Sequence, residues 1–147
     1  MKHAYDELYA GDVIIQQGGL FEYIARIHPN VDFILFVKEY MQSDLRSDID
    51  VGWPKASALL VRELYNRYTL KEGHSIPVGG CRVSENTAGW VGRFYAYYQW
   101  YWNIKSIDLV KRLTPEGLLG MYPGAHSKNM ISVIKDLPPE TLPDAEP

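Results

Sequence analysis

The chain contains a single cysteine, Cys81, in 147 residues. One thiol cannot form an intrachain disulfide, and without a second cysteine it cannot contribute to a multi-cysteine metal site. This cysteine usage is typical of a reducing compartment. We therefore expect a cytoplasmic protein.

The sequence also lacks long apolar runs and any excess of positive charge. No stretch approaches the ~20 apolar residues that a helix needs to cross a bilayer, and the start MKHAYDELYAGD does not resemble a secretory signal. We expect no membrane association. The formal net charge of -3 supplies no global positive field, which disfavours nucleic-acid binding and leaves only a local basic patch open.

Short motifs for metals and nucleotides are missing as well. The four histidines, at positions 3, 28, 74 and 126, show none of the HxxxH or HExxH spacings, and neither GxxxxGK[ST] nor GxGxxG occurs. The sequence therefore predicts no metal site and no cofactor.

One acidic cluster remains to be weighed against that prediction. Asp44, Asp48 and Asp50 surround Arg46, and clustered carboxylates can hold a divalent cation. The glycine turn and the closing glutamate of a calcium loop are both missing. We expect an ion-pair network or a solvated helix end here, and the sequence leaves cation binding by the cluster open.

The residues that are abundant predict helices. Apolar residues make up 46% of the chain and aromatic residues 13%, and apolar positions recur mostly at helical spacing. Helices are predicted at about 18–28, 31–48, 54–70, 88–104, 107–113, 115–122 and 127–137. We expect Asn30, Thr87 or Asn86, Ser106, Thr114 and His126 or Ser127 to be the N-caps.

These elements indicate an all-α protein with one compact domain over residues 1–137. We expect about five to seven helices around a central aromatic helix. Residues 1–12 carry little apolar periodicity and are predicted to be a loose arm, and 71–86 form a long loop that contains three glycines. The Pro-rich acidic tail, 138–147, is predicted to be disordered or extended.

The stretch RFYAYYQWYWN, residues 93–103, places seven aromatic side chains in eleven positions. On a helix, a broad arc takes Trp90, Phe94, Tyr97, Tyr98, Tyr101 and Trp102, with Tyr95 and Trp100 at its edges. The opposite strip holds Gly92, Ala96, Gln99 and Asn103. An arc this broad is typical of a core helix, and the strip either meets solvent or lets another helix approach at Gly92 and Ala96.

A functional interpretation of the same helix stays open. In it, Arg93, Tyr95, Tyr98 and Trp102 line a groove for a partner peptide, a planar ligand or an unpaired base. The low positive charge weakens the last of these most.

Two further hypotheses come from other segments. A small enzyme or ligand-binding domain would have its pocket between the aromatic helix and the 71–86 loop, with the candidates His74, Cys81, Glu85, Tyr95 and Arg93. A DNA-binding regulator would use the C-terminal short helices, whose basic residues include Lys105, Lys111 and Arg112. Gly117 and Gly120 argue against a rigid recognition helix there.

Residues 95–126, YAYYQWYWNIKSIDLVKRLTPEGLLGMYPGAH, resemble the C-terminal pattern of small uncharacterised bacterial proteins, some of which lie beside toxin–antitoxin or phage-defence genes. The resemblance implies an interaction protein of bacterial or mobile-element origin. Our leading hypothesis is a non-enzymatic protein-binding module, antitoxin-like or associated with defence or anti-defence, that occludes a partner such as a toxin or nuclease. The predicted binding residues are Arg93, Tyr95, Tyr98, Trp102, His74 and His126. The sequence does not determine the oligomeric state.

Overall fold

Helices account for nearly all of the regular structure. The computed structural model describes residues 7–51 and 59–144, and this part of the chain contains eight α-helices and one isolated β-bridge, so the predicted all-α fold is confirmed. The helices are α1 (Glu7–Ile27), α2 (Phe33–Met41), α3 (Asp44–Asp50), α5 (Val61–Asn66), α6 (Glu85–Trp102), α7 (Ser106–Arg112), α8 (Pro115–Ala125) and α9 (Met130–Lys135). A π-helical turn, η1 (Arg67–Lys71), follows α5, and a 3-10 turn, η2 (Pro139–Thr141), follows α9.

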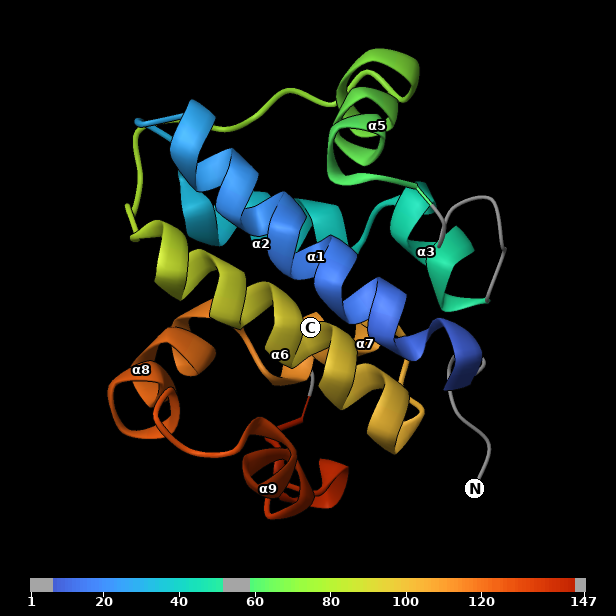
Figure 1. The fold of residues 1–147 in the computed structure, drawn as a ribbon. Coiled ribbons are helices and arrows are strands. Elements are labelled where there is room, and N and C mark those ends of the chain that lie inside the picture. The colour runs from blue at the N-terminus through green and yellow to red at the C-terminus, as the bar shows by residue number, and fades with distance from the viewer. Residues whose placement is uncertain (1–6, 52–58, 145–147) are drawn as a thin grey trace.

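The two longest helices, α1 and α6, run side by side through the middle of the molecule (Figure 1). They approach closely because glycines line their contact. A Cβ added to Gly92 would lie 2.6 Å from the Gln17 carbonyl oxygen, and one added to Gly18 would lie 2.6 Å from Cγ of Arg93. Gly92, Ala96 and Gln99 of the predicted strip are buried, and Asn103 at its end is exposed. The predicted alternative in which another helix approaches at Gly92 and Ala96 is therefore the correct one.

The other helices cover this pair on both sides (Figure 1). On one side, the Phe21 ring of α1 meets the rings of Phe33, Phe36 and Tyr40 with centroids 5.9, 5.5 and 5.8 Å apart, all edge to face. Such pairs add stability beyond the area they bury. On the other side, α7, α8 and α9 pack against α6, so α6 is the central aromatic helix that the sequence predicts.

Among the N-caps of α2, α6 and α8, only the cap of α8 is the predicted residue. Thr114 caps α8 by accepting a hydrogen bond from the Gly117 N–H, as expected. The predicted Asn30 cap is wrong, because Asp32 caps α2 instead, and Ser84 rather than Asn86 or Thr87 caps α6. In each case the capping side chain stands earlier or later than the hydrophobic pattern alone indicates.

Four other predicted boundaries differ for local reasons. The helix predicted at 31–48 is split into α2 and α3, because Ser43 accepts a hydrogen bond from the Arg46 N–H and starts a new helix. Ser106 is the first residue of α7 rather than its cap, and Asn129 caps α9 in place of His126 or Ser127. The helix predicted at 115–122 is longer than expected, since α8 continues through Pro123 to Ala125.

The described parts of the expected arm and of the expected tail, residues 7–12 and 138–144, are more ordered than predicted. Residues 7–12 of the expected arm form the start of α1, and residues 1–6 lie outside the described part. In the expected tail, η2 forms and the Leu142 side chain is only 7% exposed. The apolar side chain of Leu142 is buried in the core, which the Pro-rich composition of this segment does not reveal. The first residues of the helix predicted at 54–70 also fall outside the described part.

The long loop is fixed to the connection between α1 and α2. Val78 forms the isolated bridge with Val31, and the Gly79 N–H donates to the Asn30 carbonyl over 2.9 Å. The Asp32 N–H in turn donates to the Pro77 carbonyl over 2.8 Å. Gly79 has φ of +93°, a conformation that glycine adopts without strain. These contacts give the loop a defined path.

His28 directly follows α1 and is partly buried. Its Nε2 lies 2.8 Å from the Tyr65 hydroxyl oxygen. Burial lowers the pKa of His28 from its ordinary 6.5. The folded protein therefore keeps His28 neutral at a pH where the unfolded chain binds a proton. We expect the stability that depends on this difference to be complete above pH 6.5 and to be lost as the pH falls through 6.5 towards the lower folded pKa.

The measurement is the melting temperature of the wild type and of His28→Gln between pH 7.5 and pH 5. Glutamine keeps a hydrogen-bonding group beside Tyr65 but does not titrate, so the variant should lose less stability on acidification. His126→Gln is the control, because His126 is exposed and its variant should follow the wild type. Parallel curves for His28→Gln and wild type would refute the contribution of His28 to the pH dependence of stability.

Candidate interaction surface

Beyond its first turn, the surface of α6 is made by three residue types. After Thr87, every residue of this helix that reaches solvent is an arginine, a tyrosine or a tryptophan. We call this set the α6 stripe: Arg93, Tyr97, Trp100, Tyr101 and Trp102. Spacings of four, seven and eight from Arg93 place most of these side chains on one face.

Neighbouring helices supply charge at both edges of the α6 stripe. On the α1 side, Arg93 Nη1 lies 3.3 Å from Oε1 of Glu22, and both side chains are about two-fifths exposed. On the α9 side, Nζ of Lys135 lies 6.0 Å from the centroid of the Tyr101 ring, within range of a cation–π contact. Exposed ion pairs contribute little stability, so Arg93 is available to a partner.

Two of the predicted binding residues lie inside the core. Tyr95 and Tyr98 are fully buried, and their hydroxyls donate to the carbonyls of Leu113 over 2.6 Å and Leu137 over 2.7 Å. Burial raises the pKa of both phenols, so both stay protonated as donors at neutral pH. The helical projection places Tyr97 and Tyr101 on the broad arc expected to be core. In the structure these two side chains reach solvent instead.

Side chains of α6 and α7 hold the C-terminal segment by its backbone. The Trp102 indole N–H donates to the Ile134 carbonyl over 2.9 Å. Arg112 of α7 donates from Nη2 to the Pro139 carbonyl over 2.5 Å and from Nε to the Pro143 carbonyl over 3.2 Å. Trp102 therefore holds α9, whereas Tyr98 and Arg112 hold residues 137–143, and we call these two residues the carbonyl clamp.

The composition of the clamped segment explains why these donors are needed. Residues 137–143, LPPETLP, contain three prolines, which have no N–H with which to build a regular ladder. The dihedral angles of Pro138 and Leu142 are close to those of polyproline II. Between them, in η2, the Thr141 N–H donates to the Pro138 carbonyl and the Leu142 N–H to the Pro139 carbonyl. The Leu137 and Pro143 carbonyls lie outside this turn, and the side chains of Tyr98 and Arg112 donate to them.

The two predicted histidines lie apart from the α6 stripe. The His74 ring stacks on Tyr68 with centroids 4.3 Å apart, and its Nε2 lies 3.5 Å from Oε1 of Glu72. The His126 ring stacks on Tyr122 with centroids 4.6 Å apart. Each ring has a partner near it in sequence, and binding by these two histidines stays a prediction.

The residues proposed for a pocket beside the long loop do not converge. Cys81 is exposed, and its Sγ lies 3.7 Å from the Arg82 carbonyl oxygen. Tyr95 is in the core, and Arg93 faces Glu22. Within residues 7–51 and 59–144, no hydrogen bond or ion pair joins two of the five candidates, so the structure does not bring a nucleophile and a base together there.

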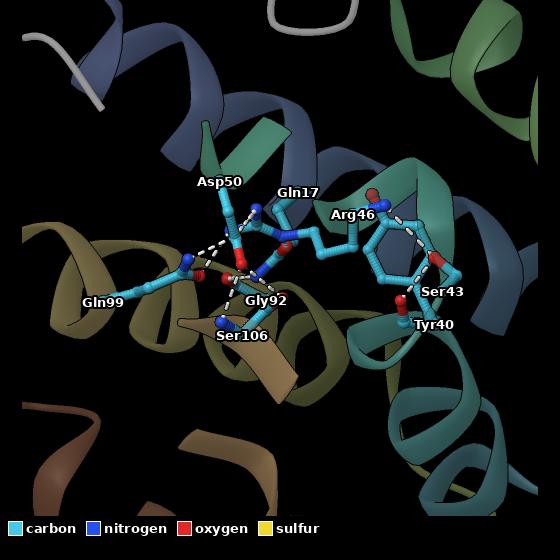
Figure 2. A network of polar contacts seen from close by, with 8 residues as sticks. All are labelled: Gln17, Tyr40, Ser43, Arg46, Asp50, Gly92, Gln99 and Ser106. Atoms are coloured by element: carbon cyan, nitrogen blue, oxygen red, sulfur yellow. Dashed lines mark hydrogen bonds and ion pairs between the residues drawn. The ribbon is translucent and has the colours of Figure 1, made fainter. Parts of the chain in front are cut away.

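A polar network that the sequence only partly predicts lies at the centre of the fold (Figure 2). Arg46 is completely buried. Its Nε donates to Oε1 of Gln17, its Nη1 to Oδ1 of Asp50 and its Nη2 to Oε1 of Gln99, each over 2.7 Å. The expected Arg46–Asp50 ion pair therefore exists, and two glutamines from distant helices complete it.

The same network links four helices. The second carboxylate oxygen of Asp50 accepts hydrogen bonds from the backbone N–H and the hydroxyl of Ser106, and the Gln99 amide also donates to Asp50. Gln17 donates to the Gly92 carbonyl over 2.8 Å. With α1, α3, α6 and α7 joined in this way (Figure 2), the network fixes the fold and offers no open face to a ligand.

The acidic cluster is divided by this arrangement. Asp50 belongs to the buried network, whereas Asp44 and Asp48 are exposed on α3. In the described ranges, no group of three or more His, Cys, Asp and Glu side chains has the arrangement of a metal site. None of the helices described has both the length and the apolar character needed to cross a bilayer.

Comparisons with models of protein families, with curated proteins and with solved structures find no match to this chain. The resemblance of residues 95–126 to bacterial interaction proteins stays a prediction. The geometry of the chain itself is the basis for assigning a function.

Proposed function

We propose that the protein is a non-enzymatic interaction module that binds another protein through the α6 stripe. The observation that carries the proposal is the composition of that surface. Arginine, tyrosine and tryptophan are the residue types that dominate binding energy at protein interfaces, and here they make up the entire solvent-facing part of α6 from residue 88 onwards.

The position of the α6 stripe supports the same function. Its residues stand on the central helix, whose other faces pack against α1, α7, α8 and α9. A rigid base reduces the conformational entropy that side chains lose on binding. Aromatic rings held partly against the core also bring a large contact area with few torsions to fix.

The finer proposal concerns the identity of the partner. The resemblance of residues 95–126 favours a bacterial antitoxin-like or defence-associated protein of the cytoplasm that occludes a toxin or a nuclease. A net charge of -3 suits a basic partner, and surfaces that bind nucleic acid are basic. Occlusion of such a surface would require no catalytic residue in this chain.

Site-specific photo-cross-linking in cells of the source organism tests the proposal. With benzoylphenylalanine in place of Tyr97, we expect one dominant protein adduct, identified by mass spectrometry. The control carries the same group at Ser127, which is exposed beyond α8, and should give no such adduct. Adding Arg93→Glu to the Tyr97 probe should lower the adduct yield about tenfold if Arg93 contributes a hot-spot contact.

Two outcomes would count against the proposal. Equal labelling from positions 97 and 127 would show that the α6 stripe has no specific partner. Salt-dependent retention of the purified protein on a phosphate matrix would instead favour the DNA-binding alternative.

A further inference from the structure

We propose that the ion pair between Glu22 and Arg93 determines which protein the α6 stripe binds, by favouring a partner whose charges match this pair in place and sign. Such a partner presents a carboxylate opposite Arg93 and an ammonium or guanidinium opposite Glu22. The inference rests on the proposed function, because it concerns the partner of the same surface, and it can fail while that function holds.

Two glycines fix the side chains of this ion pair in position. A Cβ added to Gly18 of α1 would lie 2.6 Å from Cγ and 3.3 Å from Cδ of Arg93, so the aliphatic part of this arginine lies directly on the backbone of α1. A Cβ added to Gly89 of α6 would lie 2.6 Å from Cγ of Glu22, so this glutamate lies on the backbone of α6. Each charged side chain therefore crosses to the other helix and loses little rotamer freedom when a partner binds.

The ion pair keeps hydrogen-bonding groups available at the surface. Arg93 Nη1 lies 3.3 Å from Oε1 of Glu22, and both side chains are about two-fifths exposed. Within residues 7–51 and 59–144, this is the one hydrogen bond that the guanidinium makes, although Nη2 and Nε also carry N–H groups. These donors and the second carboxylate oxygen of Glu22 can bind charged groups of a partner while the ion pair stays intact.

The ion pair also has a direction on the surface. Its negative group stands on α1 and its positive group on α6, one helical turn before Tyr97 of the α6 stripe. Tyr97 reaches solvent, so a partner that covers its ring also comes against the two charges. Like charges brought together across an interface oppose binding, whereas opposite charges set the orientation of the partner. A partner with matching charges is therefore bound, and one with the reverse arrangement is rejected.

Exchange of the two charges tests the inference. The variant Glu22→Arg/Arg93→Glu keeps an ion pair between α1 and α6 but reverses its direction. With benzoylphenylalanine in place of Tyr97 in cells of the source organism, we expect this variant to give the wild-type adduct in about tenfold lower yield per mole of folded protein. Its melting temperature, measured by circular dichroism, should stay within about 3 °C of the wild-type value, since exposed ion pairs contribute little stability.

The neutral variant Glu22→Gln/Arg93→Gln is the matched control. It loses the attraction to a partner without introducing repulsion, so its adduct yield should lie between those of the wild type and of the exchanged variant. Both variants keep the formal net charge of -3, which removes long-range attraction as an explanation. If the exchanged variant does not fold, the neutral variant decides, and wild-type yield from it would overturn the inference.

A folded exchanged variant with the wild-type adduct yield would overturn the inference and leave the proposed function standing, because the ion pair would then only join α1 to α6. An adduct between two copies of this chain would also overturn it, and two exchanged chains would still match each other. Absence of a specific adduct from the wild-type probe would overturn the proposed function itself, and the inference with it.

Discussion

Arg46→Met should lower the free energy of unfolding by about 3–5 kcal/mol, the range for breaking a buried ion pair by removing one partner. The variant removes the guanidinium that contacts Gln17, Asp50 and Gln99 at 2.7 Å. Asp50 would then remain in the protein interior with its carboxylate opposite no positive charge. A methionine fills much of the volume, so the loss is electrostatic more than steric.

Chemical denaturation measured by circular dichroism gives the change directly. Arg62→Met is the matched control, because Arg62 is exposed on α5, and its variant should differ from the wild type by no more than about 0.5 kcal/mol. The double variant Arg46→Met/Asp50→Leu should recover part of the loss, since replacing both charges by apolar groups is often close to neutral.

A small effect of Arg46→Met alone would contradict the prediction that the Arg46 guanidinium stabilises the buried Asp50 carboxylate. It would mean that Asp50 finds enough compensation in Ser106 and Gln99, which donate to its oxygens. The double variant separates these cases. If Gln99 and Ser106 suffice, removing Asp50 should destabilise the protein further instead of rescuing it.

The central polar network is predicted only in part by the sequence. Asp44, Asp48 and Asp50 stand close to Arg46 in the chain, and this local pattern predicts an ion pair. It does not predict that Asp50 is the partner, because that depends on Ser106 and Gln99, more than 45 residues away. Contacts over such separations follow from helix packing, which a single sequence does not specify.

The candidate surface on α6 is likewise predicted only in part by the sequence. Its periodicity correctly predicts a central helix with a close-approach strip at Gly92 and Ala96. The projection cannot decide which half of a nearly all-aromatic circumference faces solvent, since Tyr95 and Tyr97 have equal apolar character. Burial of the strip by α1 decides the matter, and it turns Tyr95 inward and Tyr97 outward.

The structures of residues 7–12 and of the C-terminal segment differ from the prediction for a related reason. Residues 7–12 have little apolar periodicity, yet they are helical as the first turns of α1, whose later turns pack along α6. In the C-terminal segment, proline content indicates an extended chain but says nothing about the carbonyl clamp. Its donors, Tyr98 and Arg112, come from two other helices.

Gly92→Ala should destabilise the protein by about 1–3 kcal/mol, although alanine is the better helix former by about 1 kcal/mol. The new Cβ would lie 2.6 Å from the Gln17 carbonyl oxygen and 3.0 Å from Cα of Gly18. Both atoms belong to the backbone of α1, so no side-chain rotation relieves the contact. The helices must separate, which also stretches the hydrogen bond from Gln17 to the Gly92 carbonyl.

Gly120→Ala is the matched control for the same chemical change. Gly120 lies inside α8, and a Cβ there would meet nothing within 4 Å. This variant should raise the free energy of unfolding by about 0.5–1 kcal/mol through helix propensity alone. Opposite signs for the two variants in thermal or chemical denaturation would establish that close approach of α1 and α6 requires Gly92. Stabilisation by both would show that the two helices can move apart at little cost, and the glycine contact would then not be what fixes the position of the α6 stripe.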